Sequence, residues 1–150
     1  MEKTPLDHRI VQVLMETRVV LPGAQALLGF QLAMVLMEPF ASLPRAAKLV
    51  HLGSLGCIAL ATIVLMAPAA YHRIVERGED TERFHTFASR MVLAALAFLA
   101  PGFSGDLYVV LDRIGFGQAA WICALISLLL FYSAWFGAML VVRRMMRVTA

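Results

Sequence analysis

The segment Ala100-Pro101-Gly102-Phe103-Ser104-Gly105-Asp106 lies inside a long apolar run of the sequence. Pro101 removes a backbone hydrogen-bond donor, and its ring clashes with the preceding helical turn. Two glycines loosen the backbone, and Asp106 places a carboxylate among apolar residues. The other apolar runs contain no acidic residue well inside them. We therefore expect a helix that is kinked or interrupted here, and we expect any specific chemistry of the protein to lie near this point.

The composition of the 150-residue chain indicates a membrane protein. Hydrophobic residues make up 61% of the sequence and charged residues only 15%. A soluble domain of this length cannot bury so much apolar surface, whereas lipid accepts it. The net charge of +3 does not indicate nucleic-acid binding, because the basic residues cluster at the ends of apolar runs. The sequence predicts one integral membrane domain over residues 1–150.

Four apolar runs are long enough to cross the hydrocarbon core of a bilayer, which is about 30 Å thick and needs about 20 helical residues. They predict an all-α fold, a bundle of four transmembrane helices at about residues 19–37, 49–71, 91–111 and 119–142. The charged segment from residue 71 to residue 90 links the second and third spans. Such a run of charges predicts a solvated loop or a surface helix.

The N-terminal residues 6–18 predict a separate element. Apolar and charged residues alternate there with the period of an amphipathic helix, and helices of this kind lie in the membrane interface. Pro22 suits the first turn of a new helix. We therefore expect an interfacial helix over residues 6–18 and a bend around residues 20–23. A single helix that continues straight through is the alternative.

The positive charges predict the orientation of the protein, because cytoplasmic loops carry an excess of Lys and Arg. Four spans place both termini and the charged middle segment on one side of the membrane. That side would carry Lys3, Arg9, Arg18, Arg73, Arg77, Arg83, Arg90, Arg143, Arg144 and Arg147. The opposite side would carry only Arg45, Lys48 and Arg113. We therefore expect both termini to be cytoplasmic.

Depth along the predicted spans brings three polar side chains to a similar level. With a rise of about 1.5 Å per residue, Asp106 lies about 22 Å beyond Met91, or roughly 7 Å inside the outer edge of the core. His51 lies about 5 Å inside the same edge, and Gln31 a few ångströms deeper. We predict that Gln31, His51 and Asp106 share a polar layer, with Ser54, Ser104 and Ser127 nearby.

Two interpretations of this layer follow from the residues. Ionisable side chains within a span usually face the bundle interior and have a partner. The functional interpretation is a proton- or cation-linked site at a broken helix, as transporters build them. The structural interpretation is a carboxylate near the headgroups that hydrogen-bonds His51 or a neighbouring helix end.

Signatures of enzymes and cofactors are missing from the sequence. No Gly-rich phosphate loop follows a strand, and no His-x-x-x-His pair is present. The histidines at positions 8, 51, 72 and 85 are spread over both ends of the predicted bundle, whereas a bis-histidine haem needs facing ligands at one depth. We expect no enzymatic activity, no cofactor and no metal site.

Two blocks of sequence carry a family resemblance: ETRVVLPGAQ at residues 16–25 and APAAYHR at residues 67–73, with a looser match at Asp112 before Gly115. In these blocks the chain resembles an uncharacterised bacterial family of small four-helix membrane proteins. Some members of that family carry a sodium:proton antiporter label. The resemblance implies a location in the bacterial inner membrane. It also implies that four residues matter, namely Arg18, Gln25, His72 and Arg73.

Two classes of function fit these observations. The first is a non-enzymatic accessory or scaffolding subunit of a larger respiratory or photosynthetic membrane complex. The chain is small, and Gly53, Cys57 and Ala61 form a small-residue face that another helix could approach closely. Its partners would be the lipid bilayer and other membrane subunits. The second class is a proton- or cation-coupled carrier, which would have to be a homo-oligomer because four helices are few for alternating access.

Overall fold

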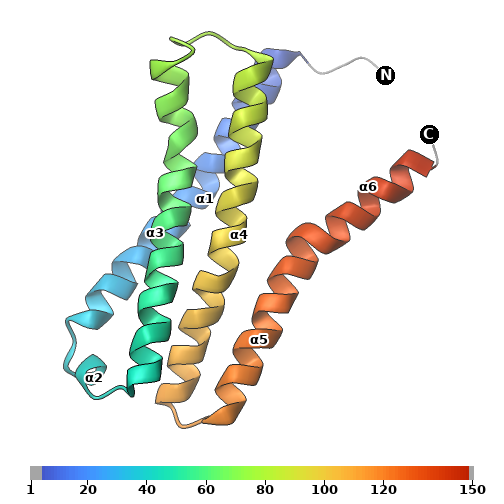
Figure 1. Ribbon diagram of the computed structural model, residues 1–150. Coiled ribbons are helices and arrows are strands. Elements are labelled where there is room, and N and C mark those ends of the chain that lie inside the picture. Colours follow the sequence, from blue (N-terminus) through green and yellow to red (C-terminus); the bar gives the residue numbers. More distant parts are fainter. Residues whose placement is uncertain (1–4, 149–150) are drawn as a thin grey trace.

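The computed structural model describes residues 5–148, and over these residues it is a bundle of helices joined by short turns (Figure 1). Its elements are α1 (Leu6–Val35), α2 (Glu38–Ala41), α3 (Arg45–Ile74), α4 (Glu82–Arg113), α5 (Gln118–Tyr132), the π-helical turn η1 (Ser133–Gly137) and α6 (Ala138–Val148). In this described part, α1, α3, α4 and the combined α5–α6 are long and apolar enough to cross a membrane. The prediction of an all-α bundle with four such helices is confirmed.

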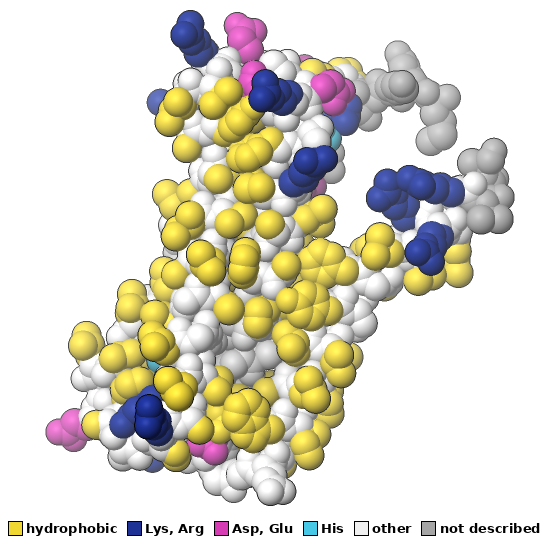
Figure 2. All heavy atoms as spheres, viewed as in Figure 1, with side chains coloured by type: hydrophobic (Ala, Val, Ile, Leu, Met, Phe, Trp, Pro, Cys, Tyr) yellow, Lys and Arg dark blue, Asp and Glu magenta, His cyan; other side chains and the backbone are white. Residues whose placement is uncertain are grey.

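The helices alternate in direction, so the start of α1, the end of α6 and the α3–α4 loop lie toward one end of the bundle (Figure 1). We call this end the basic end, because most Lys and Arg side chains lie toward it. The other end holds α2 and the α4–α5 turn, with Arg45, Lys48 and Arg113. Apolar side chains cover the flank between the two charged ends (Figure 2). This distribution is the one that a membrane-spanning bundle requires.

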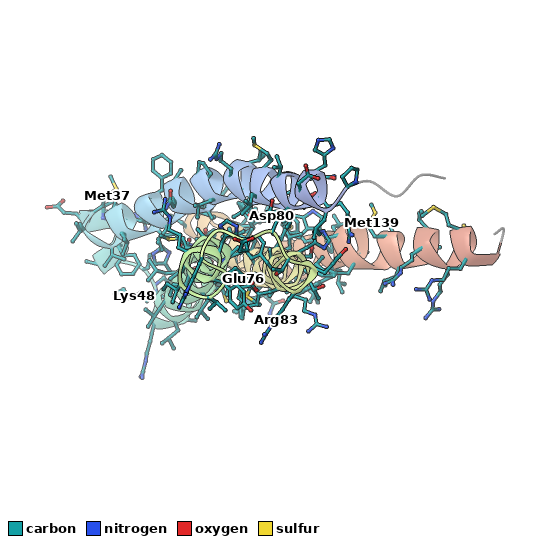
Figure 3. All side chains as sticks on the ribbon, turned by 90° about the horizontal axis from the view of Figure 1, so that it is seen from above. Met37, Lys48, Glu76, Asp80, Arg83 and Met139 are labelled. Atoms are coloured by element: carbon teal, nitrogen blue, oxygen red, sulfur yellow. The ribbon has the colours of Figure 1, made fainter. Side chains whose placement is uncertain are left out.

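The antiparallel pair α3–α4 forms the centre of the bundle and has its most extensive helix contact. Helix α1 crosses one side of this pair obliquely, and α5 packs on α4 (Figures 1 and 3). Buried apolar side chains gather in a middle cluster (Ala24, Ile58, Ala61, Leu65, Ala95, Leu99), a cluster near α2 (Leu43, Ala47, Tyr108, Val109, Ala120, Ala124) and a cluster at the basic end (Ile10, Val13, Phe84, Ala88, Val92).

The predicted interfacial helix over residues 6–18 is instead the first part of α1. The helix continues through Pro22 without an interruption, so residues 6–18 and the first span form one helix, as in the alternative prediction. The apolar face of this first part does not need the membrane interface for its burial. Ile10 and Val13 pack against Phe84 and Ala88 of α4, and this contact keeps the two helices side by side.

Helix α4 begins nine residues before its predicted span, at the basic end, whereas α3 extends past its span by only three or four residues at each end. Helices α3 and α4 contain 30 and 32 residues, or about 45–48 Å at 1.5 Å per residue, against a core of about 30 Å. The charged segment from residue 71 to residue 90 is therefore mostly helical, with a turn at residues 75–81. Thr81 caps α4, because its Oγ1 accepts a hydrogen bond of 3.0 Å from the Phe84 amide.

Helix α4 also passes through Pro101, so of the two predicted forms, a kink or an interruption, the interruption is absent. A proline in a helix leaves the carbonyl four residues earlier without its usual donor. Here that carbonyl belongs to Ala97, and the Tyr132 hydroxyl of α5 donates a hydrogen bond of 2.8 Å to it. In lipid an unpaired carbonyl costs several kcal/mol. The Tyr132 hydroxyl of the neighbouring helix thus replaces the hydrogen bond that Pro101 cannot donate.

This contact generates a first prediction. Tyr132→Phe removes the only hydroxyl that the described structure places on the Ala97 carbonyl, and it should lower the free energy of unfolding by about 1–3 kcal/mol. Unfolding in mixed micelles, followed by circular dichroism, would measure the change. Tyr71→Phe is the matched control, because the Tyr71 ring stacks on Phe87 at 4.4 Å while its hydroxyl makes no hydrogen bond to other described residues.

A second variant tests the cause of this loss. Pro101→Ala restores a backbone N–H that can bond the Ala97 carbonyl, so Tyr132→Phe should cost clearly less in the Pro101→Ala background. An equal cost in both backgrounds would show that the hydroxyl does not compensate for the proline.

Candidate polar site between α1, α3 and α4

The structure brings Gln31, His51 and Asp106 together from three different helices. Gln31 lies on α1, His51 on α3 and Asp106 on α4. Gln31 and His51 are only 3% and 2% exposed, and Asp106 is half-buried. Ser54, one turn along α3 from His51, completes the group and is 4% exposed. The depth argument from the sequence therefore places the right side chains at one level of the bundle.

Asp106 is held by donors from both neighbouring helices. The Gln31 Nε2 donates to the two carboxylate oxygens at 2.8 Å each, and the Ser54 hydroxyl lies 3.0 Å from Oδ1. The Ser54 hydroxyl also reaches the Gly102 carbonyl, one turn before Asp106 on α4. The structural interpretation named His51 or a helix end as the partner of Asp106, whereas the hydrogen bonds in the described structure come from Gln31 and Ser54.

His51 forms a hydrogen bond to the backbone of α1. Its Nε2 lies 3.1 Å from the carbonyl oxygen of Gln31, and because a carbonyl only accepts, Nε2 carries the proton. The edge of its ring meets Phe40 at a centroid distance of 5.2 Å. His51 thereby fixes the stretch of α1 that carries the Gln31 amide. It positions the donor of the site and does not touch the carboxylate.

The two glycines of the central segment allow this contact by their small size. A Cβ on Gly105 would lie 3.0 Å from Ser54 Oγ and 3.2 Å from Ser54 Cβ, and a Cβ on Gly102 would overlap the Ile58 side chain. Helix α4 can therefore approach α3 closely enough for the serine to reach Asp106. We expected these glycines to loosen the backbone, whereas in the structure they remove a steric barrier between two helices.

A cavity of about 160 Å³ lies beside the carboxylate, between α1 and α4. It is lined by Leu27, Phe30, Gln31, Met34, His51, Asp106, Val109 and Val110. Two buried acceptors of the site, Gln31 Oε1 and His51 Nδ1, have no hydrogen-bond partner among the described residues. A carboxylate beside a cavity and two unpartnered acceptors is a group that can take up a proton or a small cation. Within residues 5–148, no group of three or more His, Cys, Asp or Glu side chains could hold a metal ion.

The two other predicted serines form a separate contact. The Ser104 hydroxyl donates to Ser127 Oγ at 3.4 Å, which joins α4 to α5 on the side away from α1. Tyr132 was missed as a functional contact by the sequence analysis. The signal that could have found it is Pro101 itself, because a neighbouring helix is one source of a donor for the carbonyl that a proline frees in a membrane helix.

The residues implied by the family resemblance lie elsewhere. Arg18, His72 and Arg73 line one open groove of about 450 Å³ between α1 and α3, toward the basic end. Gln25 does not join them and is exposed on α1. The family resemblance indicated these four residues but not that three of them share a groove. The two sequence blocks that contain them are about 50 positions apart.

These features define an all-α membrane bundle in which three helices share a buried polar site. The chain belongs to a family of unknown function (DUF6328), whose family model matches residues 1–139. This agrees with the resemblance to a family of unknown function that the two sequence blocks carry. No curated protein and no solved structure matches the chain.

The close approach at the site generates the next prediction. Gly105→Ala forces Ser54 away from Asp106 and should lower the free energy of unfolding by about 1–3 kcal/mol. Gly53→Ala is the matched control, since it is also a helical glycine but has open space around its Cβ position. The control should be neutral or slightly stabilising, because alanine favours a helix over glycine. Equal losses in the two variants would contradict the proposed steric role of Gly105.

Proposed function

We propose that the protein is a non-enzymatic accessory or scaffolding subunit of a larger membrane protein complex. The observation that supports this function is the position of its fourth membrane helix. Helix α5 packs on α4 through Ala120 and Ala124, and the chain then leans away from the bundle through η1 and α6 (Figure 1). From the end, α6 and Met139 project beyond the other helices (Figure 3).

The exposed side of α5 is suited to another protein. Large apolar side chains face outward there, each at least half exposed: Trp121, Ile122, Leu125, Ile126, Leu129 and Leu130. Beside them lies a hollow of about 630 Å³ between α4 and α5, with Phe131 and Trp135 in its wall. Packed membrane helices leave few voids of this size. A helix of another subunit that inserts side chains into the hollow would complete the packing.

In this proposal the polar site has a mechanical role. Gln31, Ser54 and Asp106 hold α1, α3 and α4 in one rigid unit, which presents α5 to the partner. The excess of basic side chains at the basic end favours an orientation with both termini in the cytoplasm. The bacterial inner membrane is the corresponding location.

Site-specific photocrosslinking in native membranes tests the scaffolding function. A photoreactive amino acid at Leu125 or Leu129 should give a crosslink to one defined membrane polypeptide in high yield. The same probe at Ile63 on α3 is the control, because Ile63 is 64% exposed but lies on a helix that is already packed on its other side. Crosslinks to lipid alone at all three positions would contradict the accessory function. Crosslinks to a second copy of the chain would favour the carrier described next.

The second candidate function is a homo-oligomeric proton- or cation-coupled carrier. It is favoured by the cavity next to Asp106 and by the unpartnered acceptors of Gln31 and His51. Ionisable residues buried in membrane spans commonly mark ion pathways. The uninterrupted course of α4 removes the broken helix on which the transporter interpretation relied, so this function ranks second.

Flux measurements separate the carrier from the scaffold. If the protein is a carrier, liposomes that contain it should dissipate a pH or sodium gradient, and Asp106→Asn should return the rate to that of protein-free liposomes. Ser104→Ala is the control, since Ser104 is buried on the same helix but contacts Ser127 instead of the site. Identical rates for wild-type and protein-free liposomes would exclude the carrier function under those gradients.

A further inference from the structure

The groove between α1 and α3 lies at the edge of the membrane core. Arg18 is 13 residues from Gln31 along α1, or about 20 Å, and Arg73 is 19 residues from Ser54 along α3, or about 28 Å. Gln31 and Ser54 belong to the polar site, which the predicted spans put near the opposite edge of a core about 30 Å thick. The two arginines therefore lie on either side of the core boundary toward the basic end, at the depth of lipid headgroups.

The arginines of the groove carry positive charges that can bind an anion. Arg18 and Arg73 are both exposed, and neither forms an ion pair with another described residue. None of the described residues that line the groove is acidic. The Asp80 carboxylate lies near the groove, but its oxygen is 3.7 Å from His72 Nε2, so this carboxylate faces the imidazole and not the arginines. Two free guanidiniums from neighbouring helices thus open onto one groove.

The remaining wall of the groove is apolar. Leu21 on α1 and Leu65 and Met66 on α3 continue it from the arginines toward the middle of the membrane. A guanidinium matches a phosphate with two parallel hydrogen bonds, and an apolar wall matches an acyl chain. Basic pockets between membrane helices are known to take anionic headgroups. In the groove the guanidiniums lie toward the membrane surface and the apolar wall lies toward the membrane middle, as do the phosphate and the acyl chains of a phospholipid.

We propose that this groove is a specific site for one anionic phospholipid of the leaflet at the basic end. Arg18 and Arg73 hold the phosphate, and an acyl chain lies along Leu21, Leu65 and Met66. The volume of about 450 Å³ accommodates a headgroup phosphate and the first part of a chain. The site is separate from the Asp106 site and from the exposed face of α5. It would join α1 to α3 at the end of the bundle where the polar site does not reach.

Native mass spectrometry of the full-length protein in detergent tests the site. Phosphatidylglycerol and phosphatidylcholine with identical acyl chains are the probes. The wild-type protein should retain one phosphatidylglycerol in preference to phosphatidylcholine, and Arg18→Gln/Arg73→Gln should weaken that retention at least about tenfold, as expected for the loss of two basic contacts. Arg143→Gln/Arg144→Gln removes the same charge from α6, and this control should keep the lipid. Equal losses in the two double variants would overturn the site in favour of general surface charge.

Two further measurements keep the proposal testable if the arginine variant is unstable. Ala69→Phe fills the groove from an exposed position without changing its charge, and it should also reduce phosphatidylglycerol retention. Unchanged retention would overturn the groove as the site. Inorganic phosphate at millimolar concentration should not displace the lipid, because it lacks the chain that meets the apolar wall. Complete displacement would show that the groove binds a free anion and not a phospholipid.

Discussion

A polar group inside a membrane bundle is stabilised by a partner within the protein, and helix α4 places two groups that need such a partner within three turns. Pro101 leaves the Ala97 carbonyl without a donor, and Asp106 brings a carboxylate into the membrane. Each is satisfied by a different helix: Tyr132 of α5 bonds the carbonyl, and Gln31 of α1 and Ser54 of α3 bond the carboxylate. The segment that looks like a break in the sequence is therefore the point at which α4 holds all its neighbours.

The same requirement explains why three of the membrane helices are held together more closely than the fourth. Helices α1, α3 and α4 are all joined by the polar site and by the middle apolar cluster, whereas α5 is joined mainly to α4. Beyond Tyr132 the chain changes to a π-helical turn and leans away, with the side chains of residues 138–147 exposed. A rigid three-helix unit with one outward helix is a suitable shape for a subunit that meets others in the plane of the membrane. In the proposed scaffolding function, the polar site holds the three helices in this shape. The cavity beside Asp106 is the observation that supports the alternative, ion-linked function.

Sequence reasoning was most accurate for quantities that depend on position along a single helix. The spans and the shared depth of Gln31, His51 and Asp106 follow from hydropathy and from a fixed rise per residue. It failed where a neighbouring helix changes the outcome. Pro101 was expected to kink or interrupt α4, and residues 6–18 were expected to form a helix separate from the first span. In the structure a tyrosine on α5 compensates for the proline, and the packing of Ile10 on Phe84 keeps the N-terminal residues in α1.

The sequence by itself determined the fold class, the approximate spans and the level of the polar residues, because apolar length and helical rise are properties of one chain segment. Only the tertiary structure decided which atoms meet. In the structure, Asp106 bonds to Gln31 and Ser54 and not to His51. Gly105 is a site of close contact between helices, although the sequence indicated a flexible residue. Arg18 and Arg73 line one groove. These outcomes depend on the rotation and tilt of each helix against its neighbours. Packing between helices sets those quantities, and no single segment encodes them.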